Sequence, residues 1–67
     1  MASIDLAERI SRWRTYRKLS QAALADLLGL SAGAIGNWEH GSAAPTAKNL
    51  QALVDALDVP MPTFWGR

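Results

Sequence analysis

Residues 19–41, "LSQAALADLLGLSAGAIGNWEHG", contain the strongest structural signals in the sequence: two short helices, each with a start signal and a stop signal. Ser20 and Ser31 can each accept a hydrogen bond from an amide in the first helical turn, which is the role of an N-cap. A glycine follows each helix and suits the left-handed conformation of a helix end. We therefore predict helices over residues 21–28 and 32–40, joined through the tripeptide "GLS".

The short connection constrains how these two helices pack. A tripeptide is too tight for antiparallel packing, so we expect the helices to cross steeply. The core-facing side of the helix over residues 32–40 carries Ala34, Ile35 and Trp38. Its other side, which we expect to be exposed, carries Ala32, Gly33, Gly36 and Asn37. This exposed side is unusually poor in side-chain atoms.

Three further helices complete the chain. Ser3 can cap a helix over residues 4–18, and Thr46 can cap another over residues 47–57. Two prolines near the end of the chain can start but not continue a helix, so a short final turn is expected over residues 61–65. The apolar stripes that we expect to form the core comprise Leu6, Ile10, Trp13, Leu24, Ala25, Leu28, Leu50, Leu53, Val54 and Leu57.

Composition favours one small folded domain over residues 1–67, with a compact all-α architecture of five helices. The chain is 49% hydrophobic and 19% charged, which is typical of a globular domain rather than a disordered segment. It has no cysteine, so disulfides and thiolate metal sites are excluded, and the reducing cytoplasm is the expected location. No apolar run is long enough to span a membrane, so no membrane partner is expected.

The side chains that catalysis requires are missing. The chain holds one histidine, no cysteine, no suitable pair of carboxylates, no phosphate-binding glycine loop and no metal-ligand spacing. We therefore predict that the protein is not an enzyme and that it uses no metal, cofactor or small-molecule ligand. A tryptophan platform for single-stranded nucleic acid is a weaker interpretation, because the three tryptophans fall at helix positions expected for core or interface.

Two features point toward double-stranded DNA. A steeply crossing helix pair can lay its second helix in a major groove about 12 Å wide while the first crosses the phosphate backbone. Helix starts favour anions, which makes Ser20, Gln21 and Thr46 reasonable phosphate contacts. Five of the seven basic residues gather in the first predicted helix and suggest that one end of the fold is basic: Arg9, Arg12, Arg14, Arg17 and Lys18. A solvated helix face explains such a cluster as well.

The same residues carry a family resemblance. The stretch "LSQAALADLLGLSAGAIGNWEHG", followed by a proline and by "LQALVDALDV", resembles the Cro and phage-repressor type of helix-turn-helix domain over nearly the whole chain. The agreeing positions are Ser20, Gln21, Leu24, Ala25, Gly29, Ser31, Ile35, Trp38, Glu39, Gly41, Pro45, Leu53, Leu57 and Val59. The resemblance implies a five-helix, lambda-repressor-like domain that regulates transcription. It further implies a repressor that binds an inverted-repeat operator in double-stranded DNA as a homodimer.

The resemblance also implies roles for individual residues. Gln21 would touch a phosphate and help to position the first reading residue, and Asn37 would read an adenine through paired hydrogen bonds. Arg14 and Glu39 would form a structural pair that holds the arginine near the DNA backbone. The complete set of expected DNA contacts is Ser20, Gln21, Ser31, Ala32, Gly33, Gly36, Asn37, His40, Ser42, Thr46, Lys48 and Arg14. The plainer interpretations are a helix-start glutamine, a solvated asparagine, a surface histidine and a weak exposed ion pair.

The segment "AGAIG" departs from the family pattern. It supplies methyl groups and hydrogens where longer polar side chains are usual, which indicates either close approach to the groove floor or weak specificity. The alternative function is a helix-turn-helix fold used as a protein–protein interaction module through the same small residues. The loop after Gly41 also lacks the usual lysine or arginine, so we expect one protomer to neutralise about three or four phosphates.

The end of the chain supplies candidates for a dimer contact. Phe64 and Trp65 follow one another in the predicted final turn, and so short a turn is not expected to bury two large aromatic side chains. We therefore expect these two residues to contact a second protomer. The alternative is that they form a lid over the core.

Overall fold

The described part of the chain is all-helical in this computed structural model, which covers the backbone of residues 2–66 and the side chains of residues 5–66. The helices are α1 (Ala2–Tyr16), α2 (Gln21–Leu28), α3 (Ala32–His40), α4 (Ala47–Ala56) and α5 (Met61–Trp65). The prediction of an all-α, five-helix architecture is therefore confirmed. None of these helices is long and apolar enough to cross a membrane.

The signals at both ends of α2 and α3 act as the sequence predicts. The side chains of Ser20 and Ser31 accept hydrogen bonds from the amides three residues further on, at 2.9 and 3.3 Å. Gly29 and Gly41 end the helices with φ angles of 71° and 85°, which an L side chain would resist. Both helices therefore have the predicted bounds.

The bounds of α1 and α4 differ from the prediction by one or two residues. Ser3 lies inside α1 rather than before it, so its assignment as the N-cap is wrong. At the other end, α1 stops two residues early because Lys18 adopts a left-handed φ of 61°. Asp58 does the same after α4, with a φ of 59°. Neither residue is a glycine, so the residue types at these two positions give no signal for a left-handed turn.

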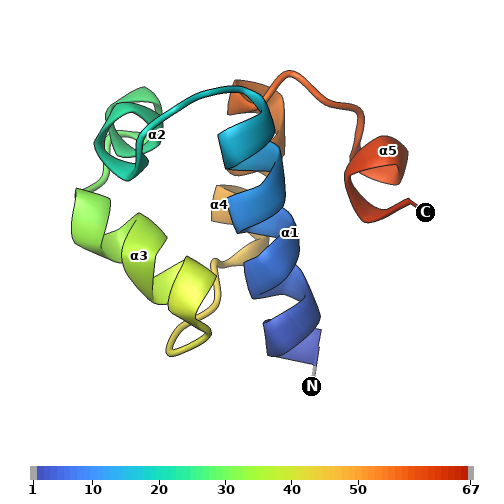
Figure 1. Cartoon of the computed structure of the whole chain (residues 1–67), viewed down its shortest axis with the longest axis horizontal. Coiled ribbons are helices and arrows are strands. Elements are labelled where there is room, and N and C mark those ends of the chain that lie inside the picture. The colour runs from blue at the N-terminus through green and yellow to red at the C-terminus, as the bar shows by residue number, and fades with distance from the viewer. Residues whose placement is uncertain (1, 67) are drawn as a thin grey trace.

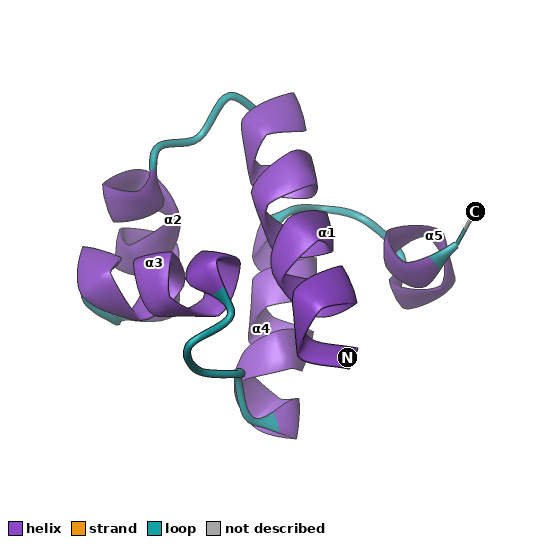
Figure 2. Ribbon diagram, turned by 60° about the horizontal axis from the view of Figure 1, so that its bottom comes forward, coloured by secondary structure: helices purple, strands orange, loops and turns teal. Residues whose placement is uncertain are grey.

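Helix α1 lies between two groups of helices. Figure 1 shows α2 and α3 on one side of α1 and α5 on the other, with α4 behind α1, and Figure 2 shows the same division after rotation. In Figure 1, α2 is seen nearly along its axis while α3 runs across the view, as expected for a steep crossing. Helix α3 packs against both α2 and α1, which leaves its opposite side free.

The core gathers one stripe from each helix. The side chains that are fully buried or nearly so include most of the predicted stripe residues, together with Ala7, Ile35, Trp38, Val59 and Phe64. Leu6, Trp13, Leu28 and Leu50 are only partly buried and pack around this cluster.

The final turn separates the two aromatic residues that were predicted to act together. Phe64 has 0% exposure inside the core, so its assignment to a dimer surface is wrong: it is the lid of the alternative interpretation. The reason is that α5 packs against both α1 and α4 and turns this ring inward. Trp65, next along the turn, remains 40% exposed.

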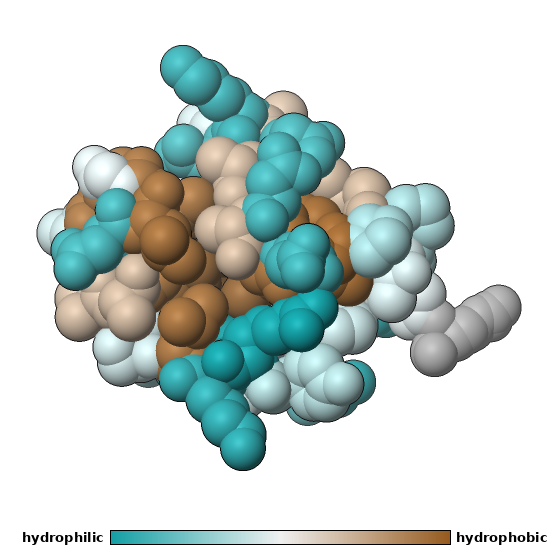
Figure 3. All heavy atoms as spheres, turned by 90° about the horizontal axis from the view of Figure 1, so that it is seen from above, coloured by the Kyte–Doolittle hydropathy of each residue, from teal (hydrophilic) through white to brown (hydrophobic). Residues whose placement is uncertain are grey.

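The basic residues of α1 and of the turn that follows it do not all gather at one end of the molecule. Arg9 donates hydrogen bonds to the carbonyl of Phe64, and Arg17 donates to the carbonyls of Leu57 and Asp58. These arginines are thus directed toward the C-terminal ends of α5 and α4, where free carbonyls attract cations. Figure 3 looks onto the end of the molecule where α1 ends and shows an apolar area on the α2 side beside hydrophilic side chains.

Candidate nucleic-acid interface

The outward side of α3 is open except at Gly36, where the side chain of Gln21 lies against it. Ala32, Gly33 and Asn37 are exposed, and Gly36 is half-buried. Ile35 and Trp38, on the opposite side, are buried in the core. The 3.6-residue repeat in the sequence therefore separates the two sides of α3 correctly, and the small-residue side is open to a partner.

The helix starts and the loop after α3 border this surface. Ser20, Ser31 and Thr46 are the N-caps of α2, α3 and α4, and each has an extended backbone and an exposed position. Lys48 lies in the first turn of α4, where its side chain is exposed. These positions leave amide groups at three helix starts, which can bind anions.

The loop that leaves α3 is held mainly by the carbonyl oxygen of Asn37, although the Gly41 amide also donates to the carbonyl of Trp38 at 3.3 Å. The oxygen of Asn37 accepts hydrogen bonds from the amides of Gly41, Ser42 and Ala43 and from the Ser42 hydroxyl at 3.3 Å. His40 and Ser42 are both exposed at this end of α3. Because its backbone is engaged in this way, Asn37 is held in place while its side chain stays exposed.

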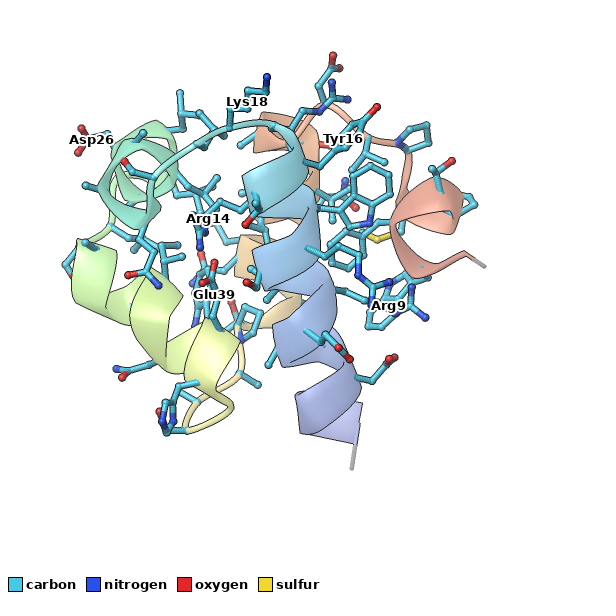
Figure 4. The ribbon with its side chains drawn as sticks, viewed as in Figure 1. Arg9, Arg14, Tyr16, Lys18, Asp26 and Glu39 are labelled. Carbon is cyan, nitrogen blue, oxygen red and sulfur yellow. The ribbon has the colours of Figure 1, made fainter. Side chains whose placement is uncertain are left out.

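Arg14 and Glu39 join α1 to α3 through a two-point ion pair. Arg14 donates from Nε to Oε2 and from Nη2 to Oε1 of Glu39, the latter at 3.0 Å, and Figure 4 shows the two side chains directed toward one another. The third nitrogen, Nη1, donates to the carbonyl of Leu19 at 2.7 Å. Every nitrogen of the guanidinium is therefore engaged within the protein, which supports the architectural role predicted for this pair.

Burial and hydrogen bonding have opposite effects on the pKa of Arg14 in this ion pair. The side chains of Arg14 and Glu39 are only 16% and 9% exposed. The hydrogen bonds to Glu39 raise the pKa of Arg14, although burial by itself would lower it. By contrast, the Arg12–Glu8 pair on the surface of α1 is loose, at 3.8 Å with both side chains 69% exposed.

Gln21 makes contacts within the protein that the sequence did not predict. Its Nε2 donates to Oε1 of Glu39 at 3.0 Å, so the amide belongs to the same network as Arg14. The amide also lies against Gly36: a Cβ built on that glycine would stand 3.6 Å from Oε1 of Gln21 and 3.8 Å from its Nε2. Gln21 thus bridges from the start of α2 to the outward side of α3.

Sequence reasoning missed two kinds of interaction. The links from Arg9 and Arg17 to carbonyls of α5 and α4 join residues 40 or more positions apart. The link from Gln21 to Glu39 joins residues 18 apart. No periodicity within one helix contains a signal for such pairs, because they depend on how helices meet.

Comparison with known proteins places the chain among helix-turn-helix proteins. A family model described as helix-turn-helix matches residues 10–64. The transcriptional repressor RstR of the cryptic phage CTXphi, from Vibrio cholerae serotype O1, is 32% identical over 96% of this chain and 57% of its own length. The repressor protein C2 of Salmonella phage P22 is 42% identical over 78% of this chain and 24% of its own length. The chain therefore spans between about a quarter and just over half of these curated relatives.

A solved structure agrees with the fold. The P22 c2 repressor protein, crystallised in complex with a synthetic operator, superposes with a TM-score of 0.79 and 37% sequence identity. The superposition covers 88% of this chain and 89% of the chain in that crystal. Because the family match runs from within α1 to within α5 and the architecture agrees, the chain belongs to the helix-turn-helix family of the Cro and phage-repressor type.

Proposed function

We propose that this domain binds double-stranded DNA sequence-specifically through the outward side of α3 and regulates transcription as a repressor. The observation that carries the proposal is the exposure of Ala32, Gly33 and Asn37 on a helix whose other side is fixed in the core. A rigid helix with a free side, flanked by helix starts, fits a major groove and its phosphates. The P22 c2 repressor, which shares this fold, was crystallised with an operator.

Two protomers on an inverted repeat are the expected arrangement. Trp65 supports this, because it is a large aromatic side chain that remains 40% exposed at the end of the domain. A second protomer would cover this ring and would place a second α3 on the next half-site, about one helical turn away. The cytoplasm remains the expected location of such a regulator.

Selection of bound duplexes from a random pool tests the proposal directly. We expect an enriched inverted repeat with half-sites about one helical turn apart. Asn37→Ala should then weaken binding to the enriched duplex by about tenfold, because an asparagine amide can pair with adenine. Gln51→Ala, which removes an exposed amide from α4, is the matched control and should have no effect. If no duplex is enriched, the protein-interaction alternative is favoured instead.

The salt dependence of binding should be modest. Arg14 is committed to Glu39 and Arg17 to the end of α4, so few cations remain for phosphates. With about three phosphates neutralised by each protomer, the logarithm of the binding constant should fall with the logarithm of salt concentration at a slope of about −3 per protomer. Fluorescence anisotropy at several salt concentrations measures this slope. A slope near zero would contradict phosphate binding.

A further inference from the structure

Gln21 places a polar group over the part of α3 that has no side chain. Gly36 offers no atoms beyond its backbone, and the Gln21 amide lies in that space, with Oε1, Nε2 and Cδ all within 3.6–4.0 Å of the missing Cβ position. The three atoms are nearly equidistant from that position, so the flat amide covers it. A side chain from α2 therefore stands where a longer residue at position 36 would otherwise project.

The chemistry of Glu39 determines which way this amide faces. A carboxylate only accepts hydrogen bonds, so the amide nitrogen of Gln21 has to be the atom directed at it. The distance of 3.0 Å from Nε2 to Oε1 of Glu39 is that of a good hydrogen bond. Arg14 keeps Glu39 in place through its own two-point contact. The oxygen of the Gln21 amide therefore points away from Glu39.

The amide oxygen of Gln21 is accessible. Within the described residues, no hydrogen-bond donor is found for this atom. Among the described residues, every buried polar side-chain atom has a hydrogen-bond partner. Since Oε1 of Gln21 has none, this atom is accessible to solvent. Gln21 itself is half-buried. The result is a hydrogen-bond acceptor with a fixed orientation beside the outward side of α3.

We propose that Oε1 of Gln21 reads the exocyclic amine of a base, adenine N6 or cytosine N4, at one position of each half-site. The inference rests on the proposed function and adds the base-edge contact that the bare segment of α3 lacks. Among the four bases, these two present a donor in the major groove, whereas guanine and thymine present acceptors there. A phosphate also only accepts, so it would be repelled by Oε1 and offers this atom nothing.

Gln21→Met tests the inference, because methionine keeps the length and helix propensity of glutamine and removes both the acceptor and the donor. Gln51→Met is the matched control. Gln51 is an exposed glutamine whose Nε2 donates to Asp55 at 3.0 Å within α4. Both variants and the unmodified chain are applied to the random duplex pool, and their thermal unfolding is compared to show that each is folded.

The unmodified chain and Gln51→Met should share one preference profile, in which one position per half-site favours A or C over G or T by about tenfold. Gln21→Met should lose that preference at that position and keep the others. If Gln21→Met keeps the whole profile and binds every duplex more weakly to the same degree, Gln21 is a phosphate contact and the inference is wrong. If the unmodified chain enriches no duplex, the proposed function itself fails, and the inference fails with it.

Discussion

Two of the three ion pairs that involve described residues of α1 illustrate, for single residues, how burial changes the role of a charge. Arg12 and Glu8 are both 69% exposed, so water competes with their attraction. Arg14 and Glu39 are 16% and 9% exposed, and they bind each other at two points. Since the folded-state pKa of Arg14 is raised, its stabilising effect is complete below the ordinary pKa of arginine. The effect is lost only as the pH rises above that value.

Breaking the Arg14–Glu39 pair from one side should destabilise the domain strongly. Glu39→Gln leaves a partly buried guanidinium without its counter-charge and should lower the free energy of unfolding by about 3 kcal/mol. The exposed control, Arg12→Gln, should change it by less than about 0.5 kcal/mol. Urea denaturation measures both values. Replacing both partners, as Arg14→Met with Glu39→Met, should cost less than Glu39→Gln alone, and a larger loss would contradict this account.

Among the helices, α3 has well-capped ends and an interior of low helix propensity. Its N-cap and C-cap are both formed, yet two glycines occupy its interior, and each costs a helix about 1 kcal/mol relative to alanine. Neither glycine is required by the packing of the free protein. A Cβ at Gly33 would meet only Ser31 Oγ at 3.8 Å, and one at Gly36 would meet only Gln21 at 3.6 Å or more. These are ordinary van der Waals distances.

Gly33→Ala and Gly36→Ala should therefore each stabilise the free domain by about 0.5–1 kcal/mol in urea denaturation. If α3 lies close to the groove floor, the same substitutions should weaken binding to the selected duplex, as fluorescence anisotropy would measure. The control is Gly41→Ala, which should destabilise the domain by about 1 kcal/mol because Gly41 has a φ of 85°. Stabilised variants that bind DNA as tightly as the original chain would argue against close approach.

In the molecule as a whole, α5 is held by the buried ring of Phe64 and by several polar links to α1. Phe64 is fully buried, and its carbonyl accepts hydrogen bonds from Arg9 Nη1 at 3.2 Å and from Trp13 Nε1 at 3.3 Å. Arg9 also donates to the carbonyl of Gly66 at 3.1 Å, and its guanidinium lies 5.6 Å from the centre of the Trp65 ring. Trp65 is thus presented at the surface beside a buried anchor.

The two aromatic residues of α5 should respond differently to truncation. Phe64→Ala should lower the free energy of unfolding by about 3–5 kcal/mol, because it opens a cavity in a small core. Trp65→Ala should change the unfolding of the monomer by about 1 kcal/mol or less, while it weakens self-association and cooperative binding to the two half-sites. Urea denaturation and sedimentation of the DNA complex measure these effects. Unchanged cooperativity in Trp65→Ala would exclude this ring from the dimer contact.

Much of the fold was predictable because its signals are local. The bounds of α2 and α3 follow from serines and glycines that act within one turn of the chain. The exposed side of α3 follows from the 3.6-residue repeat, and the family resemblance singled out Arg14 and Glu39 as a pair. The ends of α1 and α4 were misjudged by one or two residues because Lys18 and Asp58 adopt left-handed turns without a glycine.

Sequence alone was therefore enough to place the five helices to within two residues, the N-caps of α2, α3 and α4, the two sides of α3 and the family. Each of these depends on residues close together in the chain or on their spacing. Three features required the packed helices to be seen: Phe64 faces inward, Arg9 and Arg17 are directed toward the ends of other helices, and Gln21 lies over Gly36. These are contacts between helices, and they depend on the distances and angles at which whole helices pack.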